Sequence, residues 1–358
     1  MNAPILIVGT MRSGSTLLRL MLDSHPAISV GPETNFLSAV AATKDIPNWK
    51  YGREWYGRLG WSERELDARL RSFYAGMFER HAASQGKRRW GDKTPAHTDH
   101  MRLGAQVFPD AVFLGIVRHP GGTATSLMQK FHYTWQAALA YWDATNATML
   151  RDGAALGDRF AVCRYEDLVA EPERVLRDLL AWLDEPWSDS VLEHQRVQRE
   201  RGTPRLVDGD TNTREAVDSS RAERWGDEVD AGARTTMIEQ VGPLAQFFGY
   251  DPEDPSRRAR LASAKSRFAW IATGSELAER QRAWHDRIDL RPRAEIVSPD
   301  TSPEELAQRA VRAEATLARM RARRVVRVSD ALLRLRRGRS VEDLRVAARI
   351  LRRTHRAS

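Results

Sequence analysis

The feature that most constrains this chain is a change of pattern within its first 25 residues. A short apolar run, Ile5–Val8, leads into Gly9-Thr10-Met11-Arg12-Ser13-Gly14-Ser15-Thr16, and a leucine-rich stretch, Leu17–Leu22, follows. This order predicts a buried strand, a glycine-bounded turn and a helix. A helix that begins directly after such a turn presents backbone N–H groups to an anion. The loop therefore predicts a phosphate site at the end of a strand.

Further short apolar runs alternate with helical patterns along the chain. Ile28–Val30, Val112–Val117 and Phe160–Cys163 read as buried strands, and helical spacing follows the capping box at Ser62–Glu65. Strands that alternate with helices favour a parallel sheet covered on both faces, with ligands at the carboxyl ends of the strands. Trp90–Pro95 reads as a turn. The fold class we expect is a P-loop-like α/β sheet with a mainly helical C-terminal extension.

Composition changes after Asp251-Pro252-Glu253-Asp254-Pro255, where we expect a domain boundary. Residues 253–358 hold 26 Lys and Arg against 14 Asp and Glu, whereas residues 1–252 hold 30 against 34. The net charge of +8 therefore belongs to the extension, and nucleic-acid binding by residues 1–252 is not expected. A capping box with proline at Ser302–Glu305 predicts a helix to about residue 336, and Ser340 begins a last short one.

The loop lacks the lysine of nucleotide-hydrolysing P-loops. Gly9 and Gly14 have the P-loop spacing, but Ser15 stands where that loop has Lys. Since that lysine contacts the β- and γ-phosphates, its absence argues against γ-phosphoryl transfer. Arg118, at a strand end, would repel a metal ion, and His97 and His100 lack a third ligand, so we expect both at the surface. The loop predicts a phosphate compound bound without a metal.

Several motifs, taken in order over residues 4–252, resemble the sulfotransferases that use 3′-phosphoadenosine 5′-phosphosulfate (PAPS). Residues 7–18 resemble the family's 5′-phosphosulfate loop, and Val117-Arg118-His119-Pro120 with Ser126 resembles its 3′-phosphate motif. Five further segments look most like the tyrosylprotein-sulfotransferase branch: Asp23–Pro26, Gly31–Thr34, Tyr165–Leu168, Pro172–Arg174 and Phe248–Pro252. The resemblance implies a PAPS-binding sulfotransferase domain over residues 1–252 and PAPS as co-substrate.

The resemblance also implies which residues bind PAPS and its desulfated product, 3′-phosphoadenosine 5′-phosphate (PAP). The 5′-phosphate and the sulfuryl group would be held by Arg12, Ser13, Gly14, Ser15 and Thr16. Arg118 and Ser126 would hold the 3′-phosphate, and Lys130, one helical turn after Ser126, would add a cation. The remaining cofactor positions are Tyr165, Arg224 (before Trp225) and an upstream hydroxyl from Thr211 or Thr213.

Glu33 and Lys93 match the family's catalytic residues, with Arg12 as a second electrophilic group. Glu33 would take the proton of the attacking hydroxyl; the alternative is that it caps a helix that begins near Thr34. Lys93 would stabilise charge on the bridging oxygen as the S–O bond breaks; the alternative is a solvated surface lysine. These roles together describe in-line transfer.

The acceptor is expected to be a small molecule that offers a hydroxyl or an amine. The peptide-sulfating branch has a basic residue two positions after the base, where this chain has Asn35. Residues 1–252 carry an excess of acidic groups, so an acidic tyrosine peptide is a poor fit. The tryptophan-rich segment 47–61 would line the acceptor site.

Two other functions stay open on the sequence alone. One is a P-loop small-molecule kinase, and the other is a non-enzymatic scaffold that binds an anionic membrane or nucleic acid through the Arg-rich C-terminal helices. Those helices could also pack on the catalytic domain or form a homo-oligomer interface. No secretory pattern, long apolar run or disulfide framework is present, with Cys163 the single cysteine, so we expect a cytoplasmic protein.

Overall fold

The computed structural model describes residues 3–45, 58–207, 211–212, 215–250 and 271–284. The chain divides into two compact units, 1–292 and 293–358, and every described residue lies in the first. The helices expected after residue 302 therefore lie outside the described residues, as do Trp49 and Trp55 of the tryptophan-rich segment and Thr213.

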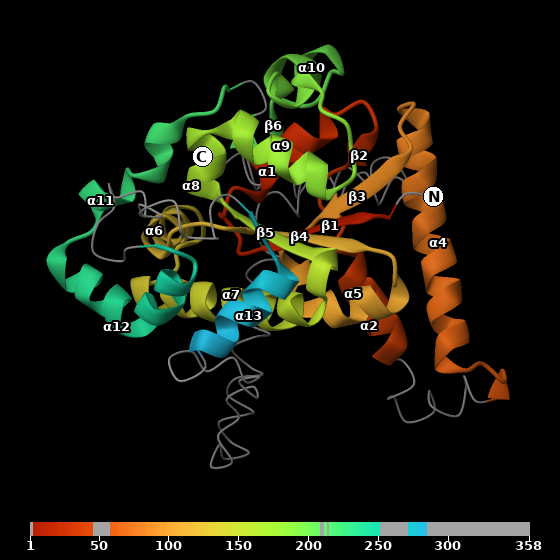
Figure 1. The fold of residues 1–358 in the computed structure, drawn as a ribbon, viewed down its shortest axis with the longest axis horizontal. Helices are drawn as coiled ribbons and strands as arrows, with labels where there is room; N and C mark the ends of the chain where they lie inside the picture. The colour runs from red at the N-terminus through yellow and green to blue at the C-terminus, as the bar shows by residue number, and fades with distance from the viewer. Residues whose placement is uncertain (1–2, 46–57, 208–210, 213–214, 251–270, 285–358) are drawn as a thin grey trace, which may run out of the picture. The chain divides into compact units, whose positions relative to one another are not determined.

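A six-stranded sheet in the order β2-β3-β1-β4-β5-β8 forms the centre of the first unit (Figure 1). Its first five strands run parallel, and the last pairs antiparallel to β5. The strands are β1 (Ile5–Gly9), β2 (Ile28–Val30), β3 (Arg89–Lys93), β4 (Val112–Val117), β5 (Phe160–Arg164) and β8 (Ile271–Thr273). The predicted α/β class is confirmed.

Helices cover both faces because alternate residues of the buried strands feed two apolar cores. Ile5 and Ile7 pack with helices α1 (Ser15–Asp23), α8 (Tyr165–Ala170) and α9 (Pro172–Trp182). Leu6 and Val8 face the opposite way, into a second core. That core is built with α2 (Phe36–Asp45), α5 (Met101–Val107), α7 (Trp135–Ala155) and α12 (Ala231–Phe247), which lie below the sheet in Figure 1.

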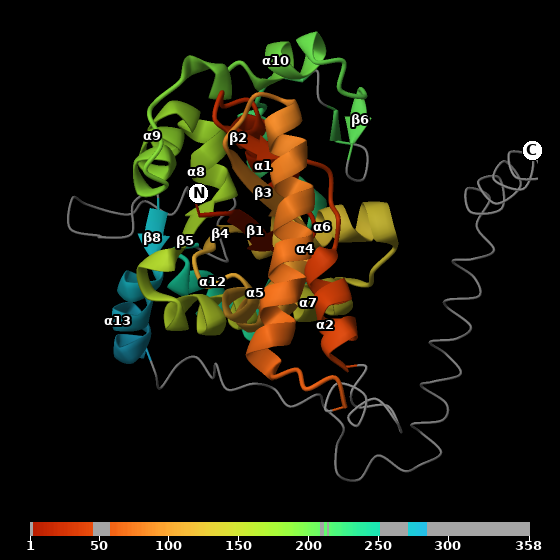
Figure 2. The ribbon, with the colours of Figure 1, turned by 90° about the vertical axis from the view of Figure 1, so that its right-hand side faces the viewer.

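The remaining elements flank the sheet and its carboxyl edge. Figure 2 shows the long helix α4 (Glu63–Ser84), whose N-cap Ser62 accepts from the Glu65 amide as the capping box predicts, running past β3. The others are α6 (Pro120–Phe131), α10 (His194–Glu200), α11 (Trp225–Glu228), α13 (Gly274–Trp284), the 3₁₀ turns η2 (Pro95–His100), η3 (Gly157–Arg159), η4 (Asp189–Val191) and η5 (Ser219–Ala222), and the hairpin β6 (Leu206–Val207)–β7 (Thr211–Asn212). Of the helices described, none is long and apolar enough to span a bilayer.

The prediction of a turn over Trp90–Pro95 is wrong for most of its length. Residues 89–93 form β3, which is buried throughout and hydrogen-bonds to both β1 and β2. Because three of its five residues are charged, the strand shows no apolar pattern in the sequence. Each of these charged side chains is hydrogen-bonded in the interior. Arg89, for example, donates to the carbonyls of Ala3 and Leu183. The chain turns only after Lys93.

The domain boundary expected at 252/253 falls too early. Ala161, Val162 and Cys163 of β5 pair with Thr273, Ala272 and Ile271 of β8. The sheet thus recruits a strand from beyond the predicted boundary, and the compact unit continues to residue 292.

Candidate active site

A cavity of about 450 Å³ opens where the parallel strands end. Lining residues follow each of these five strands: Met11, Arg12 and 14–17 after β1, Glu33 after β2, Pro95 after β3, Arg118 after β4 and Tyr165 after β5. The volume lies within the range of small-molecule sites. The cavity therefore occupies the crevice where open α/β sheets bind their ligands.

The loop between β1 and α1 is built to accept an anion. Gly14 has a φ of 91°, and a Cβ on it would lie 2.2 Å from the Tyr165 ring, so only glycine fits. Arg12 adopts the left-handed conformation, with φ 66°. The first turn of α1 has no acidic residue, and the buried Ser13 hydroxyl has no hydrogen-bond partner among the described residues. This polar cradle suits a phosphate group.

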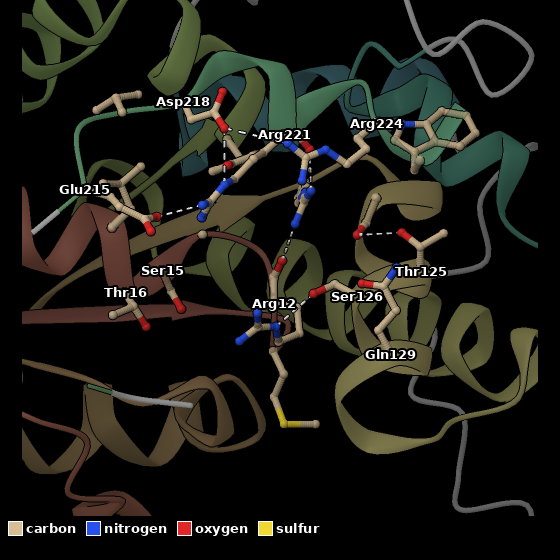
Figure 3. A pocket seen from close by; sticks show the side chains of 18 of the residues that line it. Arg12, Ser15, Thr16, Thr125, Ser126, Gln129, Glu215, Asp218, Arg221 and Arg224 are labelled. Atoms are coloured by element: carbon tan, nitrogen blue, oxygen red, sulfur yellow. Dashed lines mark hydrogen bonds and ion pairs between the residues drawn. The ribbon is translucent and has the colours of Figure 1, made fainter. Parts of the chain in front are cut away.

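Two arginines bring positive charge to this cradle. Arg12 Nε donates to Ser126 Oγ at 2.9 Å, so the loop contacts α6 (Figure 3). Arg118 Nη1 donates to the Arg12 carbonyl at 3.3 Å, and its guanidinium lies 4.7 Å from the centre of the Tyr165 ring. Burial, together with the charge of Arg118, lowers the pKa of Arg12 below its ordinary value. An anion bound here would offset the repulsion between the two guanidinium groups.

Residues 215–228 supply the other wall. Arg118 Nη2 donates to the Arg221 carbonyl at 2.8 Å, which fixes this segment to the end of β4. In Figure 3 the Arg221 guanidinium points toward Glu215 and Asp218, and the Arg224 guanidinium points toward Asp218. Arg221 forms ion pairs with Glu215 at 2.6 Å and Asp218 at 3.4 Å, and Arg224 lies 3.8 Å from Asp218. These guanidinium groups are partly balanced by carboxylates of the same wall.

A carboxylate and an ammonium meet beside the loop between β1 and α1. Lys93 is fully buried, and its Nζ donates to Thr16 Oγ1 at 3.1 Å and to Glu33 Oε1. The Glu33 side chain is 38 % exposed and lines the cavity. The alternative of a solvated surface lysine is therefore wrong. Helix α2 begins only at Phe36, and among the hydrogen bonds described no N–H of its first turn donates to the Glu33 carboxylate.

The comparisons with known proteins agree with this geometry. Residues 4–189, about half of the chain, match the sequence profile of the sulfotransferase family. The chain belongs to the sulfotransferase family. It is 27% identical to protein-tyrosine sulfotransferase 1 of Danio rerio over 69% of this chain and 72% of that protein, and 28% identical to the Homo sapiens enzyme over 69% and 70%. The sulfotransferase domain of the Synechococcus PCC 7002 olefin synthase shares the fold, with a TM-score of 0.50 at 23% identity over 70% of this chain and 97% of that domain.

Most of the residues predicted for this sulfotransferase site come together in the structure. The cavity is lined by Arg12, Gly14, Ser15, Thr16, Glu33, Arg118, Ser126, Tyr165 and Arg224. Ser13 and Lys93 are buried behind that lining. Thr211 belongs to β7. Among the residues that the structure describes, no group of three or more His, Cys, Asp or Glu is placed to hold a metal ion.

Lys130 lies about 40° around α6 from Ser126 but is not among the residues that line the cavity, so its role in cofactor binding stays a prediction. The face of α6 that lines the cavity is formed by Gly122, Thr125, Ser126 and Gln129. At about 100° per residue, Lys130 lies roughly 90° around the helix from the middle of that face. It is exposed to solvent instead.

Several residues of the site are not predicted from the sequence. Thr125, Gln129 and Arg221 line the sulfotransferase cavity, and Tyr141 on α7 accepts from the Met11 amide at 3.1 Å. Thr125 and Gln129 could have been found from the helical spacing after Arg118. Arg221 and Tyr141 carry no local motif, because loop and helix packing alone brings them to the site.

Glu166 belongs to the motif Tyr165–Leu168, which predicts no separate role for it. Its buried carboxylate accepts from the His119 amide at 2.9 Å and lies 2.8 Å from the Tyr250 hydroxyl, which is also 3.1 Å from the Val117 carbonyl. Burial raises the pKa of Glu166. These contacts fix the end of β4 from which Arg118 extends.

His194 is a cavity residue that should make stability depend on pH. Burial lowers its pKa to about 4, although a hydrogen bond with the Glu215 backbone opposes the shift. Between pH 6.5 and 4 the unfolded chain binds a proton that the folded protein does not, so the free energy of unfolding falls as the pH drops. Between pH 7 and 4.5 the free energy of unfolding of wild type falls. We expect this fall, measured by urea unfolding, to be about 2 kcal/mol smaller in His194→Gln. The exposed His81→Gln is the control, and identical losses in wild type and His194→Gln would contradict this expectation.

Proposed function

We propose that this sulfotransferase uses PAPS as donor and transfers its sulfuryl group to a hydroxyl or amine of a small, neutral acceptor. The observation that carries the proposal is the pairing of two anion-binding elements in one cavity. The first is the loop at the start of α1, and the second is Arg118 with Ser126 at α6. ATP has phosphates only at its 5′ side, so a second phosphate-binding site favours a nucleotide that is also phosphorylated at the 3′ position.

The residues present fit such a ligand. Gly14 lets the backbone of the loop pack directly against the Tyr165 ring, and the buried Ser13 Oγ and Arg118 Nε have no hydrogen-bond partner in the described part of the chain. Arg12, Ser13, Ser15 and Thr16 would hold the 5′-phosphosulfate end, and Arg118 and Ser126 the 3′-phosphate. When bound, PAPS would supply the sulfuryl group and leave as PAP.

The proposed catalytic roles follow from the side chains around Lys93. The Glu33 carboxylate is open to the cavity and would accept the proton of the acceptor hydroxyl. The buried Lys93 ammonium, beside Thr16, would stabilise negative charge at the phosphate loop where water is excluded. Arg12 would add a second cation on the side of α6. Two observations argue against the kinase alternative. The chain belongs to the sulfotransferase family, and Ser15 stands where a P-loop has its lysine.

A neutral acceptor is supported by the lining near Glu33. Asn35, whose Oδ1 accepts from Ser38 Oγ at 2.7 Å, has an uncharged side chain, so it offers no cation to an acidic peptide. Leu17, Pro95 and Val217 contribute apolar surface, and the carboxylates of the 215–228 wall would repel an anionic acceptor. The cytoplasmic location and a role of the C-terminal helices in binding other molecules remain predictions.

Binding of three nucleotides tests the donor. By calorimetry we expect PAP to bind at least about 10-fold more tightly than AMP or ATP, because only PAP offers a 3′-phosphate to Arg118 and Ser126. Arg118→Met should weaken PAP binding by about 10- to 100-fold and AMP binding by clearly less.

The exposed Arg174→Met, on α9 and outside the cavity lining, is the matched control and should not alter either affinity. Equal affinity of the wild type for PAP, AMP and ATP would refute the proposal, because the 3′-phosphate would then contribute nothing to binding.

A further inference from the structure

The loop that carries Glu33 has few contacts of its own. Residues 32–35 are all exposed, and Asn35 adopts a left-handed conformation with φ 54°. Exposed backbone with a left-handed asparagine is not held by an apolar core. Since Glu33 must reach both the cavity and Lys93, other residues have to fix this loop in place.

The loop is anchored by a cluster of buried polar groups around Asp92 on β3. Asp92 is 1% exposed. Its Oδ2 accepts from Thr34 Oγ1 at 2.7 Å, and its Oδ1 accepts from Thr94 Oγ1 at 2.8 Å. Thr94 Oγ1 in turn accepts from the Asn35 amide at 3.1 Å. The neighbours of Lys93 on both sides, Asp92 and Thr94, therefore hold the two residues that follow Glu33.

His97 holds Asp92 in this position. Its Nε2 lies 2.6 Å from Asp92 Oδ1, and the imidazole is fully buried. The prediction of a surface His97 is therefore wrong. The ring packs edge-on against Phe36, with centroids 5.0 Å apart. Its Nδ1 has no partner among the described residues, so a proton there would be a buried donor without an acceptor. The proton on Nε2, donated to Asp92, is the arrangement that avoids this cost.

The same 3₁₀ turn also touches the phosphate loop. Thr98, the residue after His97, accepts from the Gly9 amide at 2.9 Å through its hydroxyl. The turn η2 thus contacts the end of β1 and, through His97 and Asp92, the loop after β2. Three segments of the site are placed relative to one another through this short stretch.

We propose that Asp92, Thr94 and His97, together with Thr34, are positioning residues that hold Glu33 at the distance from Lys93 at which it can act as a base. This inference rests on the proposed function for the identity of the base. None of these four residues lines the cavity, so their loss should lower turnover and leave nucleotide affinity intact. A displacement of about 1 Å in a catalytic group can cost about 100-fold in rate.

The test compares disruptive and conservative variants at two positions. Thr34→Val removes the hydroxyl at nearly constant shape, and Thr34→Ser keeps it. His97→Leu removes the donor to Asp92, and His97→Gln keeps one. Thr43→Val on α2, where the Thr43 hydroxyl donates to the Ala39 carbonyl at 2.9 Å, is the matched control.

Two readouts are taken on the full chain. The first is PAP formation from PAPS, with 4-nitrophenol or water as the acceptor. The second is the hydrogen-exchange rate of the Asn35 amide in the protein without nucleotide. We expect Thr34→Val and His97→Leu to lower kcat by about 10- to 100-fold and to raise Asn35 exchange at least about 10-fold. Thr34→Ser, His97→Gln and Thr43→Val should stay within about threefold of wild type in both.

PAP affinity separates the possible failures. If wild type does not bind PAP selectively, the proposed donor is wrong, and the exchange measurement still reports on the cluster. If PAP binds normally but Thr34→Val and His97→Leu change neither kcat nor Asn35 exchange, the positioning role is refuted. It is also refuted if kcat falls only in proportion to the loss of PAP affinity or of folded protein.

Discussion

Lys93→Met is expected to lower the rate of sulfuryl transfer by about 100- to 1000-fold while PAP affinity changes only a few-fold. Lys93 Nζ is buried between Thr16 on the phosphate loop and Glu33 on the acceptor side. A fixed ammonium in such a site stabilises charge that develops during transfer far more than charge present before it. Methionine fills the space of the side chain without the charge, so the effect reports on the ammonium.

The fold should survive this substitution. Glu33 is 38% exposed at its side chain, so it regains water when its partner is lost, and the penalty of an unpaired buried charge is avoided. The measurement is steady-state PAP formation from PAPS. The control is Lys44→Met, because Lys44 on α2 forms ion pairs with Glu63 and Asp67 on α4. A loss of transfer matched by Lys44→Met, or no loss in Lys93→Met, would remove Lys93 from the catalytic residues.

Gly14→Ala is expected to weaken PAP binding at least about 100-fold and to reduce the free energy of unfolding by about 2–5 kcal/mol. Two effects combine. The φ of 91° strains any residue with a Cβ, and that Cβ would stand 2.2 Å from Tyr165 Cδ2. Relief of the clash must move either the ring of Tyr165 or the start of α1. Both line the cavity, so the backbone amides would no longer converge on the phosphate.

Gly86→Ala is the control for this prediction. Gly86 also has a positive φ, 69°, but a Cβ there meets nothing within 4 Å. It should cost about 1 kcal/mol from backbone strain and leave PAP binding unchanged. Calorimetry and urea unfolding on both variants measure the difference. Equal losses of stability would show that the contact with Tyr165 contributes nothing.

The fold could be predicted where strands are apolar on both faces. Val112–Val117 and Phe160–Cys163 stand out because a strand covered by helices on both sides buries every side chain. Strand β3 escaped because Arg89, Asp92 and Lys93 look like surface residues until their partners are known. Those partners come from segments far away in sequence, such as Leu183 and Thr16. No periodicity within β3 could have revealed them.

In the candidate site, too, some residues could be predicted from the sequence and others could not. Arg12, Glu33, Arg118 and Tyr165 each come within three residues of the end of a strand, and parallel strands gather such residues at one edge of the sheet. His97 carried no such signal, since its burial depends on the packing of Phe36 and on Asp92. The wall at 215–228 is placed by single contacts such as Arg118 with the Arg221 carbonyl, which only the folded chain shows.

The antiparallel pairing of β8 with β5 affects how this protein can be shortened. With β8 at one end of the strand order, β5 has no exposed edge. A fragment cut at residue 252, where composition alone would place the boundary, would leave the outer N–H and C=O groups of β5 unpaired. Such an edge is a template for strands from other molecules, and so for aggregation. A fragment meant to stay monomeric should therefore keep the chain through α13, to residue 284.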